Sequence, residues 1–145
     1  MSSPIASADS KIQIVTYTEV KLVEAEAALR IGNNARAATA YNLAILASLD
    51  KLGIVSSGFI AAYGNETAAS ITLEKIITQK YITLYTQAEA WSDWRRTGYP
   101  NIKPAYLNVT GSIPRRLIYP LDESNYNISN VPGGLTLMDR VWWDK

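Results

Sequence analysis

Residues 16–53, TYTEVKLVEAEAALRIGNNARAATAYNLAILASLDKLG, decide the fold of this chain. Thr16 and Glu19 have the spacing of a capping box, in which the threonine hydroxyl takes a backbone N–H and the glutamate carboxylate reaches back. Apolar residues then recur at helical spacing, at Val20, Val23, Ala27 and Ile31. Gly32 tolerates the left-handed conformation that ends many helices, so the first helix is predicted to stop there.

A second helix is predicted directly after the first. Asn33 or Asn34 can cap its start, and Gly53 marks its end just beyond Leu52. Its apolar positions are Ala37, Ala40, Tyr41, Ala44, Ile45 and Leu49. Two helices joined by so short a link must form an antiparallel hairpin.

The hairpin resembles a divergent tetratricopeptide repeat, whose length is about 34 residues. Ala37 and Tyr41 match the small-to-aromatic spacing of its second helix, and Ala25 and Ala28 occupy contact positions of its first helix. The usual tryptophan and leucine are missing, because Lys21 and Glu24 stand in their places. The alternative is an ordinary alanine-rich helical hairpin.

The rest of the chain predicts one long helix and an irregular tail. Residues 53–70 read as a connection, and residues 70–97 as a helix with an apolar stripe formed by Leu73, Ile77, Tyr81, Leu84, Tyr85, Ala88 and Trp91. Gly98 and Pro100 end it. Residues 98–145 hold five of the six prolines together with large apolar side chains, so we expect this tail to wrap over the helices. The prediction is an all-α single domain spanning residues 1–145.

Composition excludes several kinds of function. The chain has no cysteine and no histidine, which removes thiolate chemistry, Ser-His-Asp catalysis and the commonest metal ligands. Its net charge of +1 gives no general attraction to nucleic acid or anionic lipid. No apolar run is long enough to span a membrane, and the N-terminus does not read as a signal peptide. Carboxylate, lysine or tyrosine chemistry stays open on composition alone, and we expect no metal and no cofactor.

The stretch from Trp91 to Pro100 is the most distinctive one. Aromatic rings of Trp91, Trp94 and Tyr99 could stack on sugars, which makes these three the candidate ligand-binding residues. The structural interpretation, which the residues favour, is that the tryptophans fill a core. Glu89 and Asp93 lie one helical turn apart and do not straddle a substrate as a glycosidase pair would, so we expect them to pair with nearby arginines.

The tail has a basic pair of its own, in Ile113–Pro120. Arg115 and Arg116 lie inside an apolar stretch there. A contact with nucleic acid would be isolated in a chain of this charge. An ion-paired arginine that anchors the tail is the favoured interpretation.

Taken together, several blocks resemble the SusD/RagB family, in the right order along the chain. These blocks are Thr16–Arg30, Glu74–Tyr81, Glu89–Pro100, Ile113–Pro120 followed by Glu123, Asn125 and Asn127, and Val141–Asp144. The resemblance implies a mostly helical scaffold with tetratricopeptide-like hairpins and no catalytic activity. It also implies a lipid-anchored outer-membrane protein that binds glycans or other nutrients beside a SusC-like TonB-dependent transporter.

The same resemblance sets the expected role of this chain. Family proteins are longer, and their signal peptide, anchor and much of their ligand surface lie upstream, so we expect a C-terminal fragment that acts mainly as helical scaffold. The matching blocks are scaffold signatures, and no ligand-binding residue is carried over from the family. The alternative function is a tetratricopeptide-like adaptor that binds another protein inside the cell.

Overall fold

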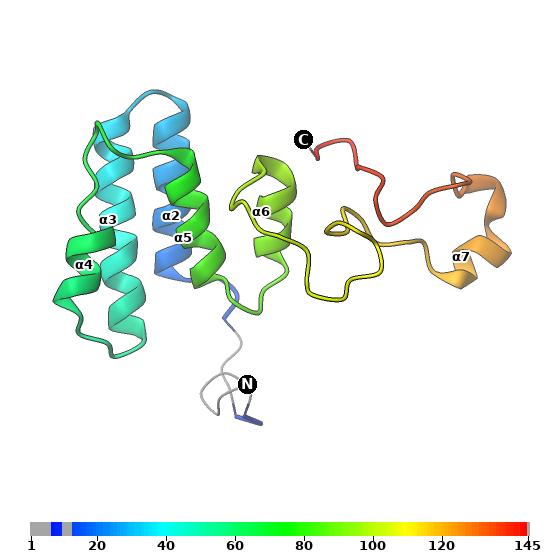
Figure 1. The fold of residues 1–145 in the computed structure, drawn as a ribbon, viewed down its shortest axis with the longest axis horizontal. Helices are drawn as coiled ribbons and strands as arrows, with labels where there is room; N and C mark the ends of the chain where they lie inside the picture. Colours follow the sequence, from blue (N-terminus) through cyan, green and yellow to red (C-terminus); the bar gives the residue numbers. More distant parts are fainter. Residues whose placement is uncertain (1–6, 10–12, 145) are drawn as a thin grey trace. The chain divides into compact units, whose positions relative to one another are not determined.

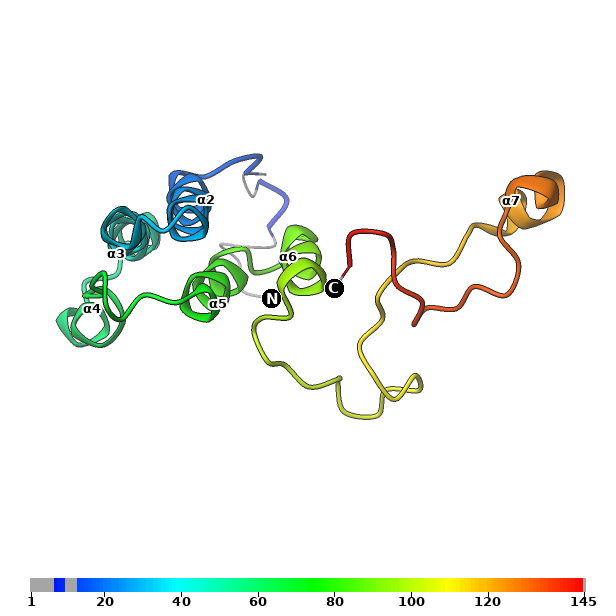
Figure 2. The same cartoon turned by 90° about the horizontal axis from the view of Figure 1, so that it is seen from above.

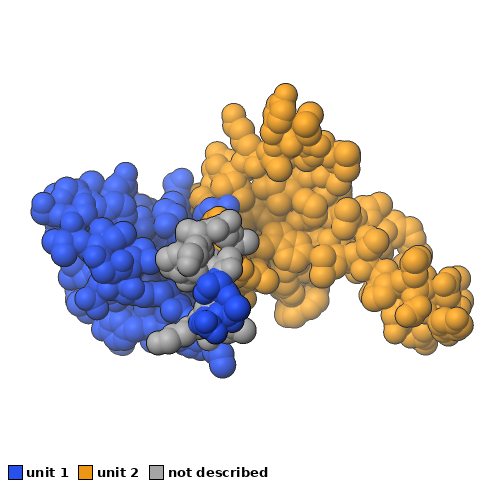
Figure 3. Space-filling model, turned by 90° about the horizontal axis from the view of Figure 1, so that it is seen from below, with its two compact units in different colours: residues 1–84 blue, residues 85–145 orange. Residues whose placement is uncertain are grey.

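The structure, a computed structural model, describes residues 7–9 and 13–144 and is entirely helical in its regular parts. It forms two compact units, residues 1–84 and residues 85–145, hereafter unit 1 and unit 2 (Figure 3). Unit 1 contains α2 (Tyr17–Arg30), α3 (Asn34–Lys51), α4 (Ser57–Tyr63) and α5 (Leu73–Thr83) (Figure 1). Unit 2 contains α6 (Glu89–Thr97), α7 (Leu121–Tyr126) and the 3₁₀ helix η1 (Ile128–Asn130). The all-α class is confirmed, and the single domain stays a prediction.

The hairpin of α2 and α3 confirms the sequence-based boundaries. Thr16 Oγ1 accepts the Glu19 N–H at 3.1 Å, and Asn33 Oδ1 accepts the Arg36 N–H at 3.2 Å, so both caps form as expected. Gly32 and Gly53 follow the two helices with φ of +78° and +64°. Its likeness to a tetratricopeptide repeat stays a prediction.

The core of unit 1 lies between α2, α3 and α5. Leu22 and Ala25 of α2 are fully buried, as are Ala37 of α3 and Ile76 of α5. Figure 2 shows α2 beside α3, with α5 next to α2. Tyr41, at 2% exposure, is the largest side chain of this core. The small alanines allow the helices of the hairpin to approach closely, which places Tyr41 fully inside.

The apolar stripe expected along α2 is not the side that packs in unit 1. Val20 and Val23 are each 49% exposed and Ile31 is 79% exposed, whereas Leu22 and Ala25 on the opposite side are fully buried. Both sides of α2 have helical periodicity. The hydrophobic pattern alone therefore did not tell which of them meets α3 and α5.

The connection between α3 and α5 contains a helix that the sequence did not predict. Ser56 Oγ accepts the Phe59 N–H at 3.2 Å and starts α4. Residues 56–58, which belong to the connection expected over residues 53–70, are in fact this helix start. The loop that follows is held by Asn42, whose amide donates to the Glu66 carbonyl at 2.8 Å and accepts the Glu66 N–H at 2.9 Å.

The predicted long helix over residues 70–97 is wrong, because it is two helices. α5 begins at Leu73 after the cap Thr72 and ends at Thr83, whose hydroxyl donates to the Lys80 carbonyl. Thr86 then has φ of +73°, which a helix cannot contain. The stripe of apolar residues runs through this break, so periodicity gave no sign of it.

The tail is largely irregular, as expected, but it includes α7 and η1. Gly98 ends α6 with φ of +79°, and its N–H donates to the Trp94 carbonyl at 2.7 Å. Within unit 2 the tail returns to α6 through residues 114–115 and 143–144. The expectation that it covers the other helices stays a prediction.

Candidate functional site

The sequence candidates Trp91 and Trp94 lie in a cluster of arginines and tryptophans in unit 2. We call it the arginine–tryptophan cluster, and it comprises Trp91, Trp94, Arg95, Arg115, Trp143 and Asp144. Trp91 and Arg95 are four residues apart on α6, and such pairs lie on one side of a helix. Trp94 is also on α6, whereas Arg115, Trp143 and Asp144 come from the tail.

Arg95 is stacked between two indole rings. Its Cζ lies 3.7 Å from the centre of the Trp91 ring and 4.4 Å from the centre of the Trp143 ring. The residue is only 8% exposed, and its Nε is buried without a hydrogen bond. The indole faces stabilise the buried cation, because their negative quadrupole attracts it.

Arg115 makes a two-pronged ion pair with Asp144. Arg115 Nε donates to Asp144 Oδ2 at 2.7 Å, and Nη2 donates to Oδ1. The Asp144 side chain is fully buried and that of Arg115 is 17% exposed. Arg115 Cζ also lies 4.7 Å from the centre of the Trp94 ring. This pair confirms the predicted ion-paired anchor of the tail.

Two hydrogen bonds connect α6 directly to the tail backbone. Trp91 Nε1 donates to the Pro114 carbonyl at 2.8 Å, and Arg95 Nη1 donates to the Arg115 carbonyl at 2.9 Å. Side chains of α6 thus satisfy carbonyls in a segment that has no strand or helix partner. The irregular stretch around Pro114 is held by side chains, since it lacks regular backbone pairing.

Asp144 is the carboxylate that acts on both arginines of the cluster. Burial lowers the pKa of the Arg95 guanidinium, while the charge of Asp144 raises it and that of Arg115 lowers it. For Arg115, the hydrogen bonds to Asp144 raise the pKa and outweigh burial. Two cations therefore share Asp144, and the three aromatic faces supply the rest of their stabilisation.

Of the two carboxylates on α6, that of Asp93 forms an ion pair. Arg96 Nη2 lies 2.7 Å from Asp93 Oδ1, and Asp93 is only 3% exposed. This confirms the expected pairing of Asp93 with a neighbouring arginine. Glu89 is exposed in the first turn of the helix.

The structure places the aromatic residues of unit 2 in two settings. Trp91 and Trp94 each have one ring face covered by a guanidinium, and Tyr99 is half-buried just after α6. Trp142, one of the large apolar side chains expected to hold the tail, is instead 94% exposed. Trp142 and Trp143 lie in a turn that the hydrogen bond from the Asp144 N–H to the Val141 carbonyl closes at 3.0 Å, and Trp143 is half-buried there. A ligand role for Trp91, Trp94 and Tyr99 stays a prediction.

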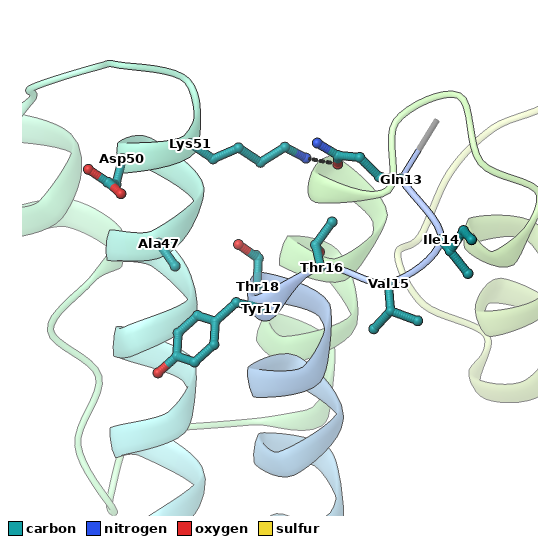
Figure 4. Close-up of a pocket in the computed structure, with 9 residues that line it drawn as sticks. All are labelled: Gln13, Ile14, Val15, Thr16, Tyr17, Thr18, Ala47, Asp50 and Lys51. Carbon is teal, nitrogen blue, oxygen red and sulfur yellow. Dashed lines mark hydrogen bonds between the residues drawn. The ribbon is translucent and has the colours of Figure 1, made fainter. Parts of the chain in front are cut away.

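A separate pocket lies in unit 1, where the start of α2 meets the end of α3 (Figure 4). Its lining consists of Gln13, Ile14, Val15, Thr16, Tyr17, Thr18, Ala47, Asp50 and Lys51. Figure 4 shows Lys51 reaching to Gln13, and its Nζ donates to Gln13 Oε1. Thr16 Oγ1 accepts the Glu19 N–H as the cap of α2, so the side chains of Thr16, Gln13 and Lys51 all have hydrogen-bond partners within the chain.

Two further findings concern the described part of the chain. Residues 7–9 and 13–144 hold no group of three or more Asp or Glu side chains placed to bind a metal ion. No helix among them has the length and apolar character needed to cross a membrane.

Comparison with known proteins identifies the family. Residues 1–120 match the family SusD-like_2, described as "Starch-binding associating with outer membrane". No curated protein and no solved structure matches the chain. The match covers most of the 145 residues and confirms the resemblance found in the sequence. The chain therefore belongs to the SusD-like family, whose members are starch-binding proteins associated with the outer membrane.

Proposed function

We propose that this chain is a non-catalytic, mainly structural part of a nutrient-binding receptor in an outer-membrane uptake system. The nutrient is a glycan, and the partner is a TonB-dependent transporter of the SusC type. The chain forms the C-terminal part of that receptor. The observation that carries the proposal is the family match over residues 1–120, with its description as starch-binding and outer-membrane associated.

The arginine–tryptophan cluster supports the structural role. Sugar-binding tryptophans present an open ring face to the ligand, whereas one face of Trp91 and one face of Trp94 are in contact with arginines. The N–H of Trp91 is also taken by the Pro114 carbonyl. Both rings therefore help to hold the tail against α6, and this is a structural role.

Location and partner test the proposal first. The native gene, tagged at its own locus, should yield a product that fractionates with the outer membrane and co-purifies with a SusC-type transporter. Recovery from the cytosol with a soluble protein partner would contradict the uptake role. That result would favour the adaptor function instead.

Ligand binding tests the scaffold role. We expect the Trp91→Phe and Trp94→Phe variants of the receptor, isolated from its host, to bind soluble starch as well as the unchanged receptor does. Native gel electrophoresis in starch-containing gels measures this directly. A variant that stays folded and loses starch binding would show that these rings contact ligand and would overturn the scaffold role. An unchanged receptor retarded by no glycan of a panel would reject a glycan as the nutrient.

A further inference from the structure

The pocket of unit 1, between the start of α2 and the end of α3, contains polar side chains that the fold does not use. Its volume of about 730 Å³ lies within the range of roughly 300–1,000 Å³ that is typical of small-molecule sites. Among the nine side chains drawn in Figure 4, one hydrogen bond is formed, from Lys51 to Gln13. The hydroxyl groups of Tyr17 and Thr18 and the carboxylate of Asp50 are therefore available to a ligand.

Thr18 is the pocket residue whose polar group most needs a partner. Its side chain lines the pocket and the residue is only 4% exposed. Within residues 7–9 and 13–144, no group forms a hydrogen bond with its hydroxyl. A buried hydroxyl is normally hydrogen-bonded, because leaving it without a partner costs free energy. The pocket thus presents a polar group whose partner does not come from the described part of the chain.

Tyr17 adds an aromatic surface to the same pocket. It is 60% exposed, and the Lys21 ammonium lies 5.6 Å from the centre of its ring. Lys21 is held there by its ion pair with Glu24 at 2.8 Å. Ile14 and Val15, 89% and 65% exposed, also line the pocket and add apolar surface. An accessible aromatic ring with a hydroxyl at its tip suits a sugar, which has an apolar C–H face and a polar rim.

The charges of the pocket favour a neutral, hydroxyl-rich ligand. Asp50 brings a carboxylate that has no ion pair among the described residues, and the next residue, Lys51, brings an ammonium that reaches across to Gln13 (Figure 4). An anion would be attracted by the ammonium and repelled by the carboxylate, and a cation would meet the reverse. Sugar hydroxyls can donate to the carboxylate and accept from the ammonium, whose three N–H groups are not all used by Gln13.

We propose that this pocket is a glycan subsite, in which the Tyr17 ring stacks on one sugar while Thr18 and Asp50 hydrogen-bond to its hydroxyls. The inference rests on the proposed glycan-binding function and deepens it, because it gives this chain a ligand contact of its own. Every residue that lines the pocket lies within the match to the family described as starch-binding. The ligand class is therefore an α-glucan.

Chemical footprinting tests the proposal on the receptor isolated from its host. Lys51 is an exposed residue of the pocket, and Lys103 is an exposed lysine of unit 2 that serves as the internal reference. The probe is maltoheptaose. Acetylation of Lys51 relative to Lys103, measured by mass spectrometry, should slow roughly threefold once the sugar concentration is about twice its Kd.

Matched variants connect this protection to the proposed contacts. Tyr17→Ala should abolish the protection of Lys51, and Thr18→Val, which keeps the shape of the side chain and removes its hydroxyl, should weaken it. Tyr126→Ala, at an 88% exposed tyrosine of α7, is the control and should keep the full protection. Circular dichroism verifies that each variant is folded. Full protection in either pocket variant overturns the proposal.

The starch gel separates failure of this inference from failure of the proposed function. A receptor that starch retards, but in which maltoheptaose does not protect Lys51, overturns the subsite and leaves the glycan role intact. A receptor that no glycan retards rejects the glycan role and the subsite with it.

Discussion

Arg115 and Asp144 are 29 residues apart in sequence, yet the guanidinium donates to both oxygens of the carboxylate. The pair connects the segment after Pro114 to the last described residue, and its carboxylate side chain is fully buried. Arg115 also stacks on Trp94 and is hydrogen-bonded to the Arg95 carbonyl at 3.4 Å. The irregular tail is thus held to α6 by one ion pair and the rings around it.

Loss of this pair should unfold unit 2 selectively. Asp144→Asn leaves a buried guanidinium without its charge partner, which costs about 3 kcal/mol in the free energy of unfolding. All four tryptophans lie at positions 91, 94, 142 and 143, so denaturant unfolding followed by tryptophan fluorescence reports unit 2. Asp122→Asn on the exposed start of α7 is the control and should change nothing. Equal stability of the two variants would contradict the role of the pair.

The two adjacent tryptophans near the end should behave oppositely. Trp143→Ala removes one of the two rings that enclose the Arg95 guanidinium and should cost about 3 kcal/mol. Trp142→Ala changes a ring that is 94% exposed and should leave the unfolding midpoint within experimental error. Chemical denaturation measures both. A larger loss from Trp142→Ala than from Trp143→Ala would mean that the outward ring is the one that packs.

Alkaline unfolding of unit 1 should depend on Tyr41. Burial raises the pKa of its phenol to about 12 from 10.0, with Glu66 adding to this and a hydrogen bond with Gln79 opposing it. Since the unfolded phenol ionises first, the free energy of unfolding is unaffected below pH 10 and decreases as the pH rises towards 12. The Tyr41→Phe variant should therefore lose less free energy of unfolding at alkaline pH. Near neutral pH it should be about 1 kcal/mol less stable, because Gln79 loses its hydrogen-bond partner.

Circular dichroism follows this transition, because most of the helical residues belong to unit 1. Tyr106→Phe is the matched control, since that ring is 93% exposed. The explanation is rejected if Tyr41→Phe retains the full alkaline loss of helicity.

Acid sensitivity of unit 1 should depend on Glu66. Burial alone would raise the pKa of this carboxyl, but hydrogen bonds from Lys75 and Ser70 outweigh it and lower the pKa below 4.5. A depressed folded pKa contributes stability that is complete above the unfolded value and is lost as the pH falls through the folded one. Glu66→Gln should therefore flatten the acid limb of the stability profile, measured by circular dichroism. Glu74→Gln, at an exposed position of α5, serves as the control, and an equal effect there would contradict the assignment.

The limits of sequence reasoning are visible in α5 and α6. Leu73 to Trp91 keep helical spacing, but Thr86 takes a positive φ and the helix is interrupted there. Of that stripe only Ile77 and Leu84 are buried, whereas Tyr85 and Ala88, on either side of the break, are exposed. Periodicity reports which residues share a side, and it does not report whether the backbone between them stays helical.

The contacts of the candidate site were likewise predictable only in part. The sequence did predict ion pairs for Asp93 and for Arg115. A charged side chain buried among apolar residues needs an oppositely charged partner. That the partner of Arg115 is Asp144, and that Trp91 and Trp143 enclose Arg95, was not predictable. These contacts join residues separated by many positions of irregular chain.

The sequence by itself determined where α2 and α3 begin and end, since Thr16, Gly32, Asn33 and Gly53 act within one helical turn of their own positions. It also determined the family, through blocks that stand in order along the chain. Only the tertiary structure decided which side of α2 is buried and which rings enclose Arg95. The physical reason is range: a cap depends on hydrogen bonds to the nearest backbone groups, whereas a packed side depends on partners brought from elsewhere in the chain.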